Sequence, residues 1–252
     1  MKGYEAAHRT LLPRRTYTIL RLDGRAFHTY LRDTQKPFDL DFVADMAAVT
    51  AALCEEAGGA ALGYAQSDEI SLLLTDFASP GTEPWFGGVV AKQLSVSASL
   101  ATAVLNERRP GGRALFDARV FTVSDPVEVA NYFVWRQRDA VRNSISTAAR
   151  AHFPHQRLDR VSSGAMRELL RSEKGIDWND YPDSCKRGQL ALRRTGERPV
   201  EYVDGRTGET VRTTAPTSCW EVTAAPHFTT GPTGRLARVI PARPVLGAGF
   251  GG

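Results

Sequence analysis

The sequence predicts an α+β fold in which an antiparallel sheet carries two helices on one of its faces. Segments typical of strands and helices follow one another in the order strand, helix, strand, strand, helix, strand, which is the split βαβ pattern. The strand-like segments are short and rich in β-branched and aromatic residues, whereas the helix-like segments place apolar residues at helical spacing. The chain has 252 residues, 42% of them hydrophobic, and is therefore long enough to bury a core of this kind.

The first half of the chain supplies the six elements of this pattern. The first strand ends at an Asp-Gly turn pair, and the first helix begins at an aspartate suited to cap it and stops at a Gly-Gly pair. The second and third strands are joined through residues 66–69, and the second helix is rich in Ala, Ser and Val. We expect strands at 16–22, 62–65, 70–74 and 116–123, and helices at 39–57 and 86–105.

The second half of the chain has a helical part followed by a β-rich part. Helical spacing recurs at 126–151 and 161–173. Residues 199–213 are typical of a β-hairpin that turns near residues 205–208, and residues 246–252 are expected to form a flexible tail. These changes divide the chain into residues 1–125, 126–194 and 195–252.

Composition and charge exclude several classes of protein. No apolar run approaches the roughly 20 residues that a membrane helix needs, and the N-terminus lacks the apolar core of a secretory signal. The three cysteines, Cys54, Cys185 and Cys219, are too widely spaced for a disulfide framework or a Cys-x-x-Cys metal site, so we expect a cytoplasmic protein. The net charge of +4, carried mostly by arginine, is compatible with a nucleotide or RNA partner without requiring one.

Acidic side chains lie where two of the predicted strands end. Asp23 is part of RLDGRAFH, residues 21–28, and Asp68 is part of QSDEIS, residues 66–71. Taken alone, each motif is most simply a solvated turn. The split βαβ topology, however, places the first strand beside the hairpin and brings the two carboxylates to one sheet edge. Carboxylates that converge with no Arg or Lys between them repel each other unless cations separate them, and hard oxygen ligands favour Mg²⁺.

Scattered basic residues are candidates to neutralise phosphates, although most exposed cations simply solvate a surface. Residues 135–139, WRQRD, place an aromatic side chain beside cations within a predicted helix. This Trp either stacks on a base or packs in the core, as a helical Trp more often does. His152 and His155 flank a proline and are therefore poorly placed to share a metal on one helix. The candidate cations are Arg21, Arg25, Lys36, Lys92, Arg119, Arg136, Lys186 and Arg187.

Seven segments in a fixed order make the sequence resemble the tRNA-His guanylyltransferases, which are reverse-direction nucleotide polymerases, and in particular their bacterial-type Thg-like relatives. The motifs RxDGRxFH and GxxQSDExS are long enough to be specific in combination. The resemblance covers residues 4–194, roughly three quarters of the chain. The segments are RLDGRAFH at 21–28, GYAQSDEISLLL at 63–74, WF at 85–86, Lys92, FDARVF at 116–121, YFVWRQRDAVRN at 132–143 and DWNDYPDSCKRG at 177–188.

The resemblance implies a division of labour along the chain. Residues 1–125 would form a polymerase-like palm, 126–194 a helical fingers-like region and 195–252 a β-rich C-terminal extension. In the family, the palm binds two Mg²⁺ through the residues that match Asp23, the backbone carbonyl of Gly24, and Asp68. Glu69 would lie beside the metals as a further catalytic carboxylate.

The resemblance also implies binding sites for a nucleoside triphosphate and for RNA. The nucleotide would contact Asp23, Gly24, Arg25, Ala26, Phe27, His28, Ser67, Asp68, Lys36 and Lys92. The RNA would contact Arg21, Arg136, Asn143, Lys186 and Arg187.

The implied activity is a Mg²⁺-dependent 3′–5′ nucleotidyl transfer to the 5′ end of tRNA, in tRNA-His maturation or 5′-end repair. Relatives activate a 5′ monophosphate with ATP, and the 3′ hydroxyl of GTP or a templated NTP then displaces AMP; a 5′ triphosphate needs no activation. They assemble as tetramers, dimers of dimers. Val141 replaces the leading His of the eukaryotic His-Ile-Asn-Asn-Leu-Tyr-Asn-Thr stretch, of which Asn143 is retained, and this favours the broader templated-repair group.

Two alternatives share parts of this interpretation. A palm-type nucleotidyl cyclase has the same metal-binding carboxylates but needs no RNA surface, and it would form a cyclic nucleotide without RNA. A catalytically silent RNA-binding module would retain the fold and bind RNA without turnover. The sequence does not distinguish which nucleotide or which tRNA is preferred.

Overall fold

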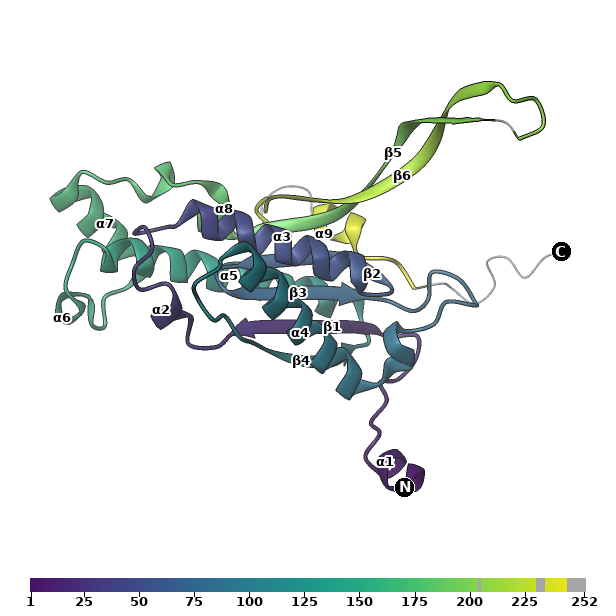
Figure 1. Cartoon of the computed structure of the whole chain (residues 1–252). Helices are drawn as coiled ribbons and strands as arrows, with labels where there is room; N and C mark the ends of the chain where they lie inside the picture. Colours follow the sequence, from purple (N-terminus) through teal and green to yellow (C-terminus); the bar gives the residue numbers. More distant parts are fainter. Residues whose placement is uncertain (204, 230–233, 244–252) are drawn as a thin grey trace.

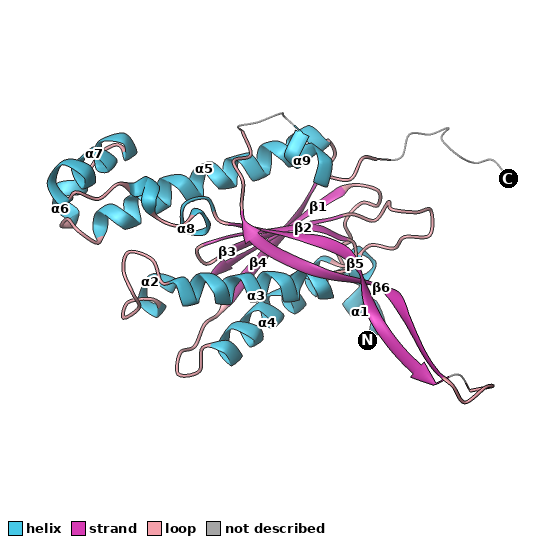
Figure 2. Ribbon diagram, turned by 90° about the horizontal axis from the view of Figure 1, so that it is seen from above, coloured by secondary structure: helices cyan, strands magenta, loops and turns pink. Residues whose placement is uncertain are grey.

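The computed structural model describes residues 1–203, 205–229 and 234–243, and it shows a six-stranded antiparallel sheet between two layers of helices (Figures 1 and 2). The strand order is β4-β1-β3-β2-β5-β6. The first four strands of the chain form the predicted split βαβ sheet, so the predicted α+β class is confirmed. The strands are β1 (Tyr17–Gly24), β2 (Ala60–Gln66), β3 (Glu69–Leu74), β4 (Phe116–Val123), β5 (Gln189–Val203) and β6 (Thr210–Ala224).

The long helices begin and end near the boundaries that the sequence predicts. Asp39 caps the helix at Leu40–Glu56, since its carboxylate accepts a 3.0 Å hydrogen bond from the N–H of Phe42. The helices are α1 (Lys2–Ala7), α2 (Phe27–Tyr30), α3 (Leu40–Glu56), α4 (Val90–Arg108), α5 (Pro126–Arg150), α6 (His155–Leu158), α7 (Ser163–Lys174), α8 (Asp183–Arg187) and α9 (Gly234–Val239), with 3₁₀ turns η1 (Trp85–Gly88) and η2 (Trp178–Asp180).

The helices α3 and α4 cover one face of the sheet, as predicted (Figure 2). Their apolar stripes pack on the side chains of β1 and β3 that alternate toward them, such as Leu20 and Leu72. A glycine lets α3 approach closely: a Cβ at Gly63 would lie 2.6 Å from the sulfur of Cys54 and 2.9 Å from Thr50. The close helix–sheet contact therefore depends on the missing side chain.

The opposite face of the sheet is covered by the first half of α5 together with α9. Tyr17 and Ile19 of β1 pack there against Val129 and Phe133 of α5, all of them fully buried. The helical part that the sequence sets apart as 126–194 thus begins on the palm-like sheet itself. This contact matters for function because it places one face of α5 beside the strand ends.

The second half of α5 extends beyond the sheet and carries a small apolar cluster of its own (Figure 1). Ile145 and Ala148 pack there with Leu170 of α7 and with Trp178 of η2. The short helix α8 follows and returns the chain to the sheet, where β5 pairs with β2. The predicted helices at 126–151 and 161–173 are therefore both present.

The predicted C-terminal hairpin is longer than the sequence indicates, and it is continuous with the sheet. β5 pairs with β2 through three residue pairs and with β6 over fifteen, so the strand crosses the expected boundary at residue 194. The outer part of the hairpin projects away from the body of the molecule (Figure 1). The expected tail at 246–252 lies outside the described residues.

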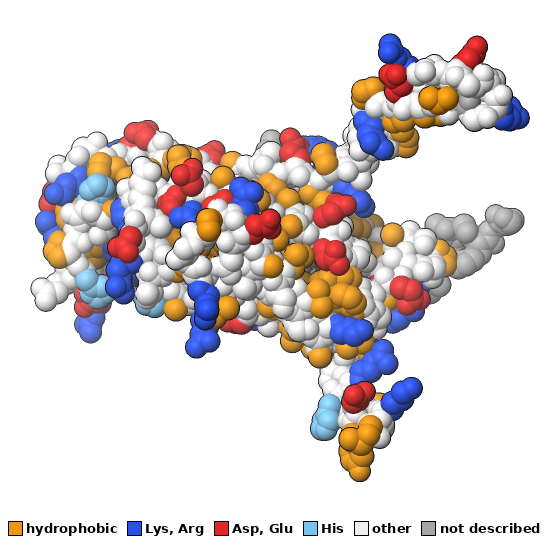
Figure 3. Space-filling model, viewed as in Figure 1, with side chains coloured by type: hydrophobic (Ala, Val, Ile, Leu, Met, Phe, Trp, Pro, Cys, Tyr) orange, Lys and Arg blue, Asp and Glu red, His pale blue; other side chains and the backbone are white. Residues whose placement is uncertain are grey.

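The surface carries charges of both signs. Acidic and basic side chains are interspersed over the face seen in Figure 3, and the projecting hairpin also carries both. Among the described residues, none of the helices has the length and apolar character that crossing a membrane requires.

Candidate active site

Three carboxylates from neighbouring strands meet at one edge of the sheet. Asp23, near the end of β1, pairs in register with Glu69 of β3 on one side and with Asp117 of β4 on the other. Because Leu22 faces α3 and α4, strand alternation places Asp23 on the opposite face, the one that α5 partly covers. Directly paired residues in antiparallel strands lie close together, so the three side chains are neighbours.

The turn between β2 and β3 brings a fourth carboxylate to the same edge. The N–H of Gly24 donates a 3.1 Å hydrogen bond to the backbone carbonyl of Asp68, which joins this turn to the end of β1. Asp23 and Asp68, 45 positions apart (68 − 23), are therefore adjacent in the structure, as the split βαβ topology predicts.

Both motifs hold a non-glycine residue in a left-handed backbone conformation. Ser67, in the β2–β3 turn, has φ 49°, and Ala26, the residue before α2, has φ 56°. Such a conformation costs a residue with a Cβ about 1–2 kcal/mol. Strained residues of this kind persist where the surrounding structure imposes them, and they gather at functional sites.

The two aspartates disfavour each other's negative charge. Burial raises the pKa of Asp68, and the charges of Asp23 and Glu69 raise it further, against hydrogen bonds from its own N–H and from Ser67. Burial also raises the pKa of Asp23, with further contributions from Glu69 and Asp117 that outweigh those of nearby arginines. A divalent cation between the two aspartates would relieve this repulsion.

The oxygen donors at this edge fit a hard cation such as Mg²⁺. Carboxylates of Asp23 and Asp68 and the backbone carbonyl of Gly24 are the donor types that Mg²⁺ prefers. Within the described parts of the chain, no three His, Cys, Asp or Glu side chains are clustered so that they form a metal site by themselves. A cation held here would therefore need backbone, water or substrate oxygens to complete its ligands, as Mg²⁺ commonly does.

Glu69 differs from the other carboxylates because two arginines hold it. Arg136 of α5 donates from Nε and Nη2 to its two oxygens at 2.7 and 2.8 Å, and Arg21 of β1 lies 2.5 Å away. Glu69 is only 6% exposed. Unlike Asp23 and Asp68, for which the sequence predicts no arginine clamp, Glu69 has its oxygens occupied by guanidinium groups rather than free for a metal.

Most of the side chains expected to contact RNA are held by partners within the protein. Arg136 is 4% exposed and is held by Glu69 and Asp139, so it is not free to meet a phosphate. Lys186 and Arg187 are buried and both pair with Asp183. Burial and internal ion pairs oppose contact of these three side chains with an RNA phosphate, and their role in RNA binding stays a prediction.

The two remaining candidates for RNA contact differ from each other. Arg21 is half-buried between the strands and belongs to the Glu69 pair. Asn143 is exposed on α5 and makes only a long, 3.4 Å hydrogen bond to Asp139. Asn143 is thus the one of the five predicted RNA contacts that an RNA would reach without breaking an internal ion pair.

The loop from Gly24 to α2 is fixed from beneath by an aromatic anchor. Phe27 is buried against Phe42 and Phe116, and a Cβ at Gly24 would lie 2.4 Å from its ring. The N–H of Arg25 donates to the carbonyl of Leu115 at 2.8 Å. Gly24 is therefore required sterically, while the exposed side chains above this anchor stay available to a ligand; these are Arg25 and His28.

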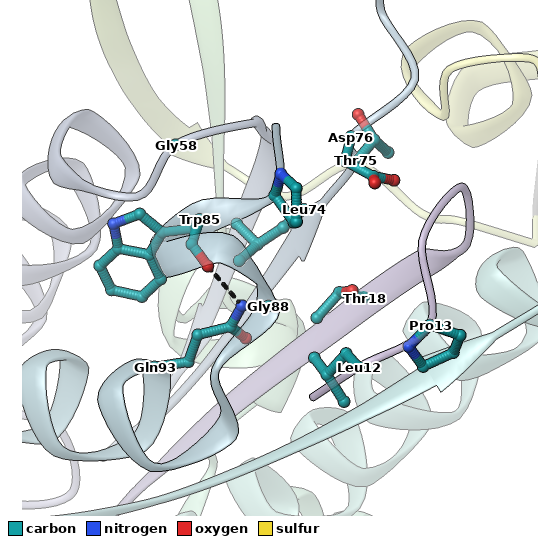
Figure 4. A pocket seen from close by; sticks show the side chains of 11 residues that line it. Leu12, Pro13, Thr18, Gly58, Leu74, Thr75, Asp76, Trp85, Gly88 and Gln93 are labelled. Carbon is teal, nitrogen blue, oxygen red and sulfur yellow. Dashed lines mark hydrogen bonds between the residues drawn. The ribbon is translucent and has the colours of Figure 1, made fainter. Parts of the chain in front are cut away.

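The two lysines expected at the nucleotide lie in different places. Lys36 is exposed a few residues beyond α2, and its Nζ donates to the carbonyl of Leu31 at 2.6 Å. Lys92 is in the first turn of α4 and lies over the ring of Phe86. Its neighbour Gln93 lines a cavity of about 10 Å³ together with Thr18, near the start of β1 (Figure 4).

That cavity marks the other end of the sheet from the carboxylates. Thr18 and Asp23 are five positions apart on β1, which corresponds to about 17 Å of extended strand. Within this chain the structure therefore does not bring Lys92 to the carboxylates. The cavity itself holds little more than one water molecule.

Sequence reasoning missed Asp117 as a member of the site and left Arg119 among the scattered cations. Arg119 lies 4.0 Å from Asp23 and 3.4 Å from Asp117, and it is exposed. The alternation in FDARVF places residues 117, 119 and 121 on one face of β4. The missing information was the register of β4 against β1, which no local pattern gives.

The comparisons with known proteins agree with this geometry. The family model described as Thg1, tRNAHis guanylyltransferase, matches residues 1–124. A solved bacterial Thg1-like protein in complex with ATP is 37% identical, with a TM-score of 0.82 over 96% of this chain and 97% of that one. A bacterial Thg1-like protein in complex with GTP is 36% identical, with a TM-score of 0.76 over 95% and 96% of the two chains.

Curated relatives extend to eukaryotes. The tRNA(His) guanylyltransferase of Schizosaccharomyces pombe is 27% identical over 212 residues, 77% of this chain and 78% of that protein. The strand order, the paired aspartates and these similarities agree with one another. The chain belongs to the Thg1 family of tRNAHis guanylyltransferases, a family of nucleotidyltransferase enzymes.

Proposed function

We propose that this protein is a Mg²⁺-dependent 3′–5′ nucleotidyltransferase that adds GTP-derived or templated nucleotides to the 5′ end of tRNA. The observation that carries the proposal is the meeting of Asp23 and Asp68 at the sheet edge, beside the anchored loop at Gly24. The similarity to bacterial relatives in complex with ATP and GTP supports nucleoside triphosphates as substrates. Val141, where eukaryotic enzymes carry His, favours 5′-end repair over dedicated tRNA-His maturation.

In this proposal Asp23, the carbonyl of Gly24, and Asp68 hold two Mg²⁺ ions. When bound, Mg²⁺ lowers the pKa of an attacking hydroxyl and neutralises charge on the triphosphate. The chain itself positions the triphosphate through the loop from Asp23 to His28 and through Ser67, with Arg25 and Lys36 as exposed cations near it. Arg119 adds positive charge beside Asp23, where negative charge would develop during transfer.

Two other parts of the proposal follow from the family rather than from this chain. Residues 1–125 act as the palm-like catalytic part, 126–194 as the fingers-like part and 195–252 as an extension, and four copies assemble as a dimer of dimers. A cytoplasmic location is consistent with a tRNA substrate and with the free cysteines Cys54, Cys185 and Cys219. Light scattering of the purified protein tests the tetramer directly.

The experiment offers the protein a tRNA that lacks its first 5′ nucleotide, with Mg²⁺ and labelled NTPs. Substrates with 5′ monophosphate and 5′ triphosphate are compared, because only the former requires ATP. Asp23→Asn and Asp68→Asn keep the shape of the side chains but remove the charges. Asp159→Asn, at an exposed aspartate away from the site, is the matched control.

We expect wild type and Asp159→Asn to add label opposite the template base. Each site variant should lose activity by at least about 100-fold, because removal of a metal ligand or charge stabiliser costs several kcal/mol of transition-state stabilisation. Full activity in both site variants would contradict the proposal. Formation of a cyclic nucleotide without RNA would favour the cyclase, and RNA binding without turnover would favour the silent binding module.

A further inference from the structure

An exposed aromatic surface lies beside the carboxylates, on the same face of the sheet. Trp135 of α5 is 53% exposed and Phe121 of β4 is 38% exposed. The ring of Tyr132 joins them, with ring centroids 5.9 Å from Trp135 and 5.7 Å from Phe121. The sequence leaves open whether this Trp packs in the core or stacks on a base, and its exposure excludes the core.

The inner members of this surface are fixed in place, so the exposed rings have a rigid support. The hydroxyl of Tyr132 hydrogen-bonds that of Ser71 at 2.8 Å. The guanidinium of Arg136 lies 4.3 Å from the centre of the Trp135 ring while it holds Glu69. Trp135 is thus connected, through Arg136 and Glu69, to the strand position that pairs with Asp23.

The charges around these rings favour a nucleic acid over an apolar partner. Arg138 and Arg142 follow Trp135 at i+3 and i+7, so they share its side of α5, and both are exposed. Arg138 makes no ion pair or hydrogen bond within the part of the chain that the structure describes. On β4, the exposed Arg119 lies between Phe121 and Asp117. Arg142 pairs with Asp139 and Arg119 with Asp117, but both guanidinium groups remain exposed. Aromatic rings bordered by exposed cations match the alternation of bases and phosphates along a strand.

We propose that Trp135 and Phe121 form a stacking surface for the base at the 5′ end of the RNA substrate. The proposal rests on the proposed function and names the residues that position the RNA end. The triphosphate loop at residues 24–28 lies past the end of β1, whereas the aromatic surface lies on the sheet face behind Asp23. The nucleotide and the RNA end would therefore approach the carboxylates from different sides.

The test measures RNA binding separately from transfer. The probe is a 5′-monophosphorylated tRNA without its first nucleotide, and a second version has an abasic residue at its 5′ end. Trp135→Ala removes the ring and Trp135→Phe restores an aromatic face. Tyr202→Ala is the matched control, since Tyr202 is an equally exposed aromatic on the projecting hairpin. Thermal unfolding of each variant confirms that it is folded.

We expect Trp135→Ala to weaken RNA binding and raise the KM for RNA by about 5- to 100-fold, with a smaller effect on kcat. Trp135→Phe should recover most of the affinity, and Tyr202→Ala should match wild type. Abasic RNA should bind wild type about as weakly as the intact RNA binds Trp135→Ala. Abasic RNA should bind Trp135→Ala only slightly more weakly than it binds wild type, because the base that would stack on the ring is already absent.

Several outcomes would overturn the stacking proposal without touching the proposed function. If wild type and Trp135→Ala bound intact RNA with equal affinity, or if both proteins lost all affinity for abasic RNA, Trp135 would be an exposed residue with no specific role in binding the terminal base. A variant that loses affinity for free ATP or GTP but not for RNA would assign the surface to the nucleotide instead. Wild-type protein that binds intact RNA better than abasic RNA but never transfers a nucleotide would contradict only the proposed function. Absence of any RNA binding would contradict both.

Discussion

Glu69 is a buried carboxylate at the strand ends, and neighbouring arginines balance its negative charge. Its two oxygens accept hydrogen bonds from Arg136, and Arg21 lies 2.5 Å away, all at positions with little access to water. In this arrangement Glu69 is clamped by arginines, whereas Asp23 is approached at 4.0 Å by the exposed Arg119 and Asp68 pairs with no arginine among the described residues. Removing a single member leaves a buried charge without its partner, which costs more than the pair contributes.

We predict that Glu69→Gln lowers the free energy of unfolding by about 3 kcal/mol, because it leaves the buried Arg136 with only Asp139 as a counter-charge. The exposed pair between Glu201 and Arg212, at 3.0 Å, provides the control. Glu201→Gln should cost less than about 1 kcal/mol. Urea denaturation of both variants measures the difference, and equal losses would show that burial does not set the strength of the Glu69 pair.

At Ser67, the effect of the β2–β3 turn on stability can be measured separately from its effect on activity. We predict that Ser67→Gly raises the free energy of unfolding by about 0.5–1 kcal/mol, because glycine adopts a φ of 49° without strain. The same change removes the hydroxyl that lowers the pKa of Asp68, so activity should fall and its pH profile should move to higher pH. Stability and activity would thus change in opposite directions.

Ser67→Ala is the control for this pair of effects. It removes the hydroxyl but keeps a Cβ in the left-handed conformation, so activity should fall with no gain in stability. Denaturation curves and pH–rate profiles of the three proteins check the prediction. If the Gly and Ala variants were equally stable, the strain assigned to Ser67 would be contradicted.

At the scale of elements, α3 is connected to α4 through its N-cap residue, Asp39. Asp39 caps α3 through the N–H of Phe42, and it also accepts a 3.0 Å bond from Arg109 just beyond α4. Burial raises the pKa of Asp39, but the Phe42 hydrogen bond and Arg109 outweigh it, so the pKa is lower than usual. The charged form is therefore favoured in the folded state.

We predict that Asp39→Asn keeps the cap but loses the attraction to Arg109. Because the folded pKa is lowered, the charged Asp39 stabilises the wild type above the ordinary aspartate pKa, near 4, and this advantage disappears as the pH falls through the lower folded value. The two proteins should differ by about 1 kcal/mol at pH 7 and converge near pH 2–3. Urea denaturation across this range tests the sign, and a constant difference would contradict it.

At the scale of the whole molecule, local sequence patterns predict the helices and strands along the chain but not the contacts between residues that are distant in sequence. The elements of the split βαβ sheet follow from apolar spacing and turn residues, and that topology alone places Asp23 beside Asp68. The clamp on Glu69 joins residues 67 positions apart on a strand and a helix, and no local pattern encodes that contact. The burial of Lys186 and Arg187 likewise depends on how α8 packs, which their charge alone does not reveal.

The projecting hairpin is the part of the molecule that contributes least to its core. From Glu197 to Pro216, the described residues of β5 and β6 pair with each other, and none of them is buried. A two-stranded ribbon without a packed face has little stability of its own. Its exposed edges carry arginine and glutamate, such as Arg198 and Glu201, which disfavour uncontrolled edge-to-edge pairing.

We predict that replacing residues 197–216 by an Asn-Gly turn changes the free energy of unfolding by less than about 1 kcal/mol, because none of the described side chains in this range is buried. Gly196 and Thr217 pair across the strands and offer a suitable junction. The comparison is made by urea denaturation at a low protein concentration, so that assembly does not add to the measured stability. A fall of several kcal/mol in the free energy of unfolding would mean that the ribbon is part of the cooperative fold. The ribbon would then have a structural role, and the rest of the molecule would not be stable without it.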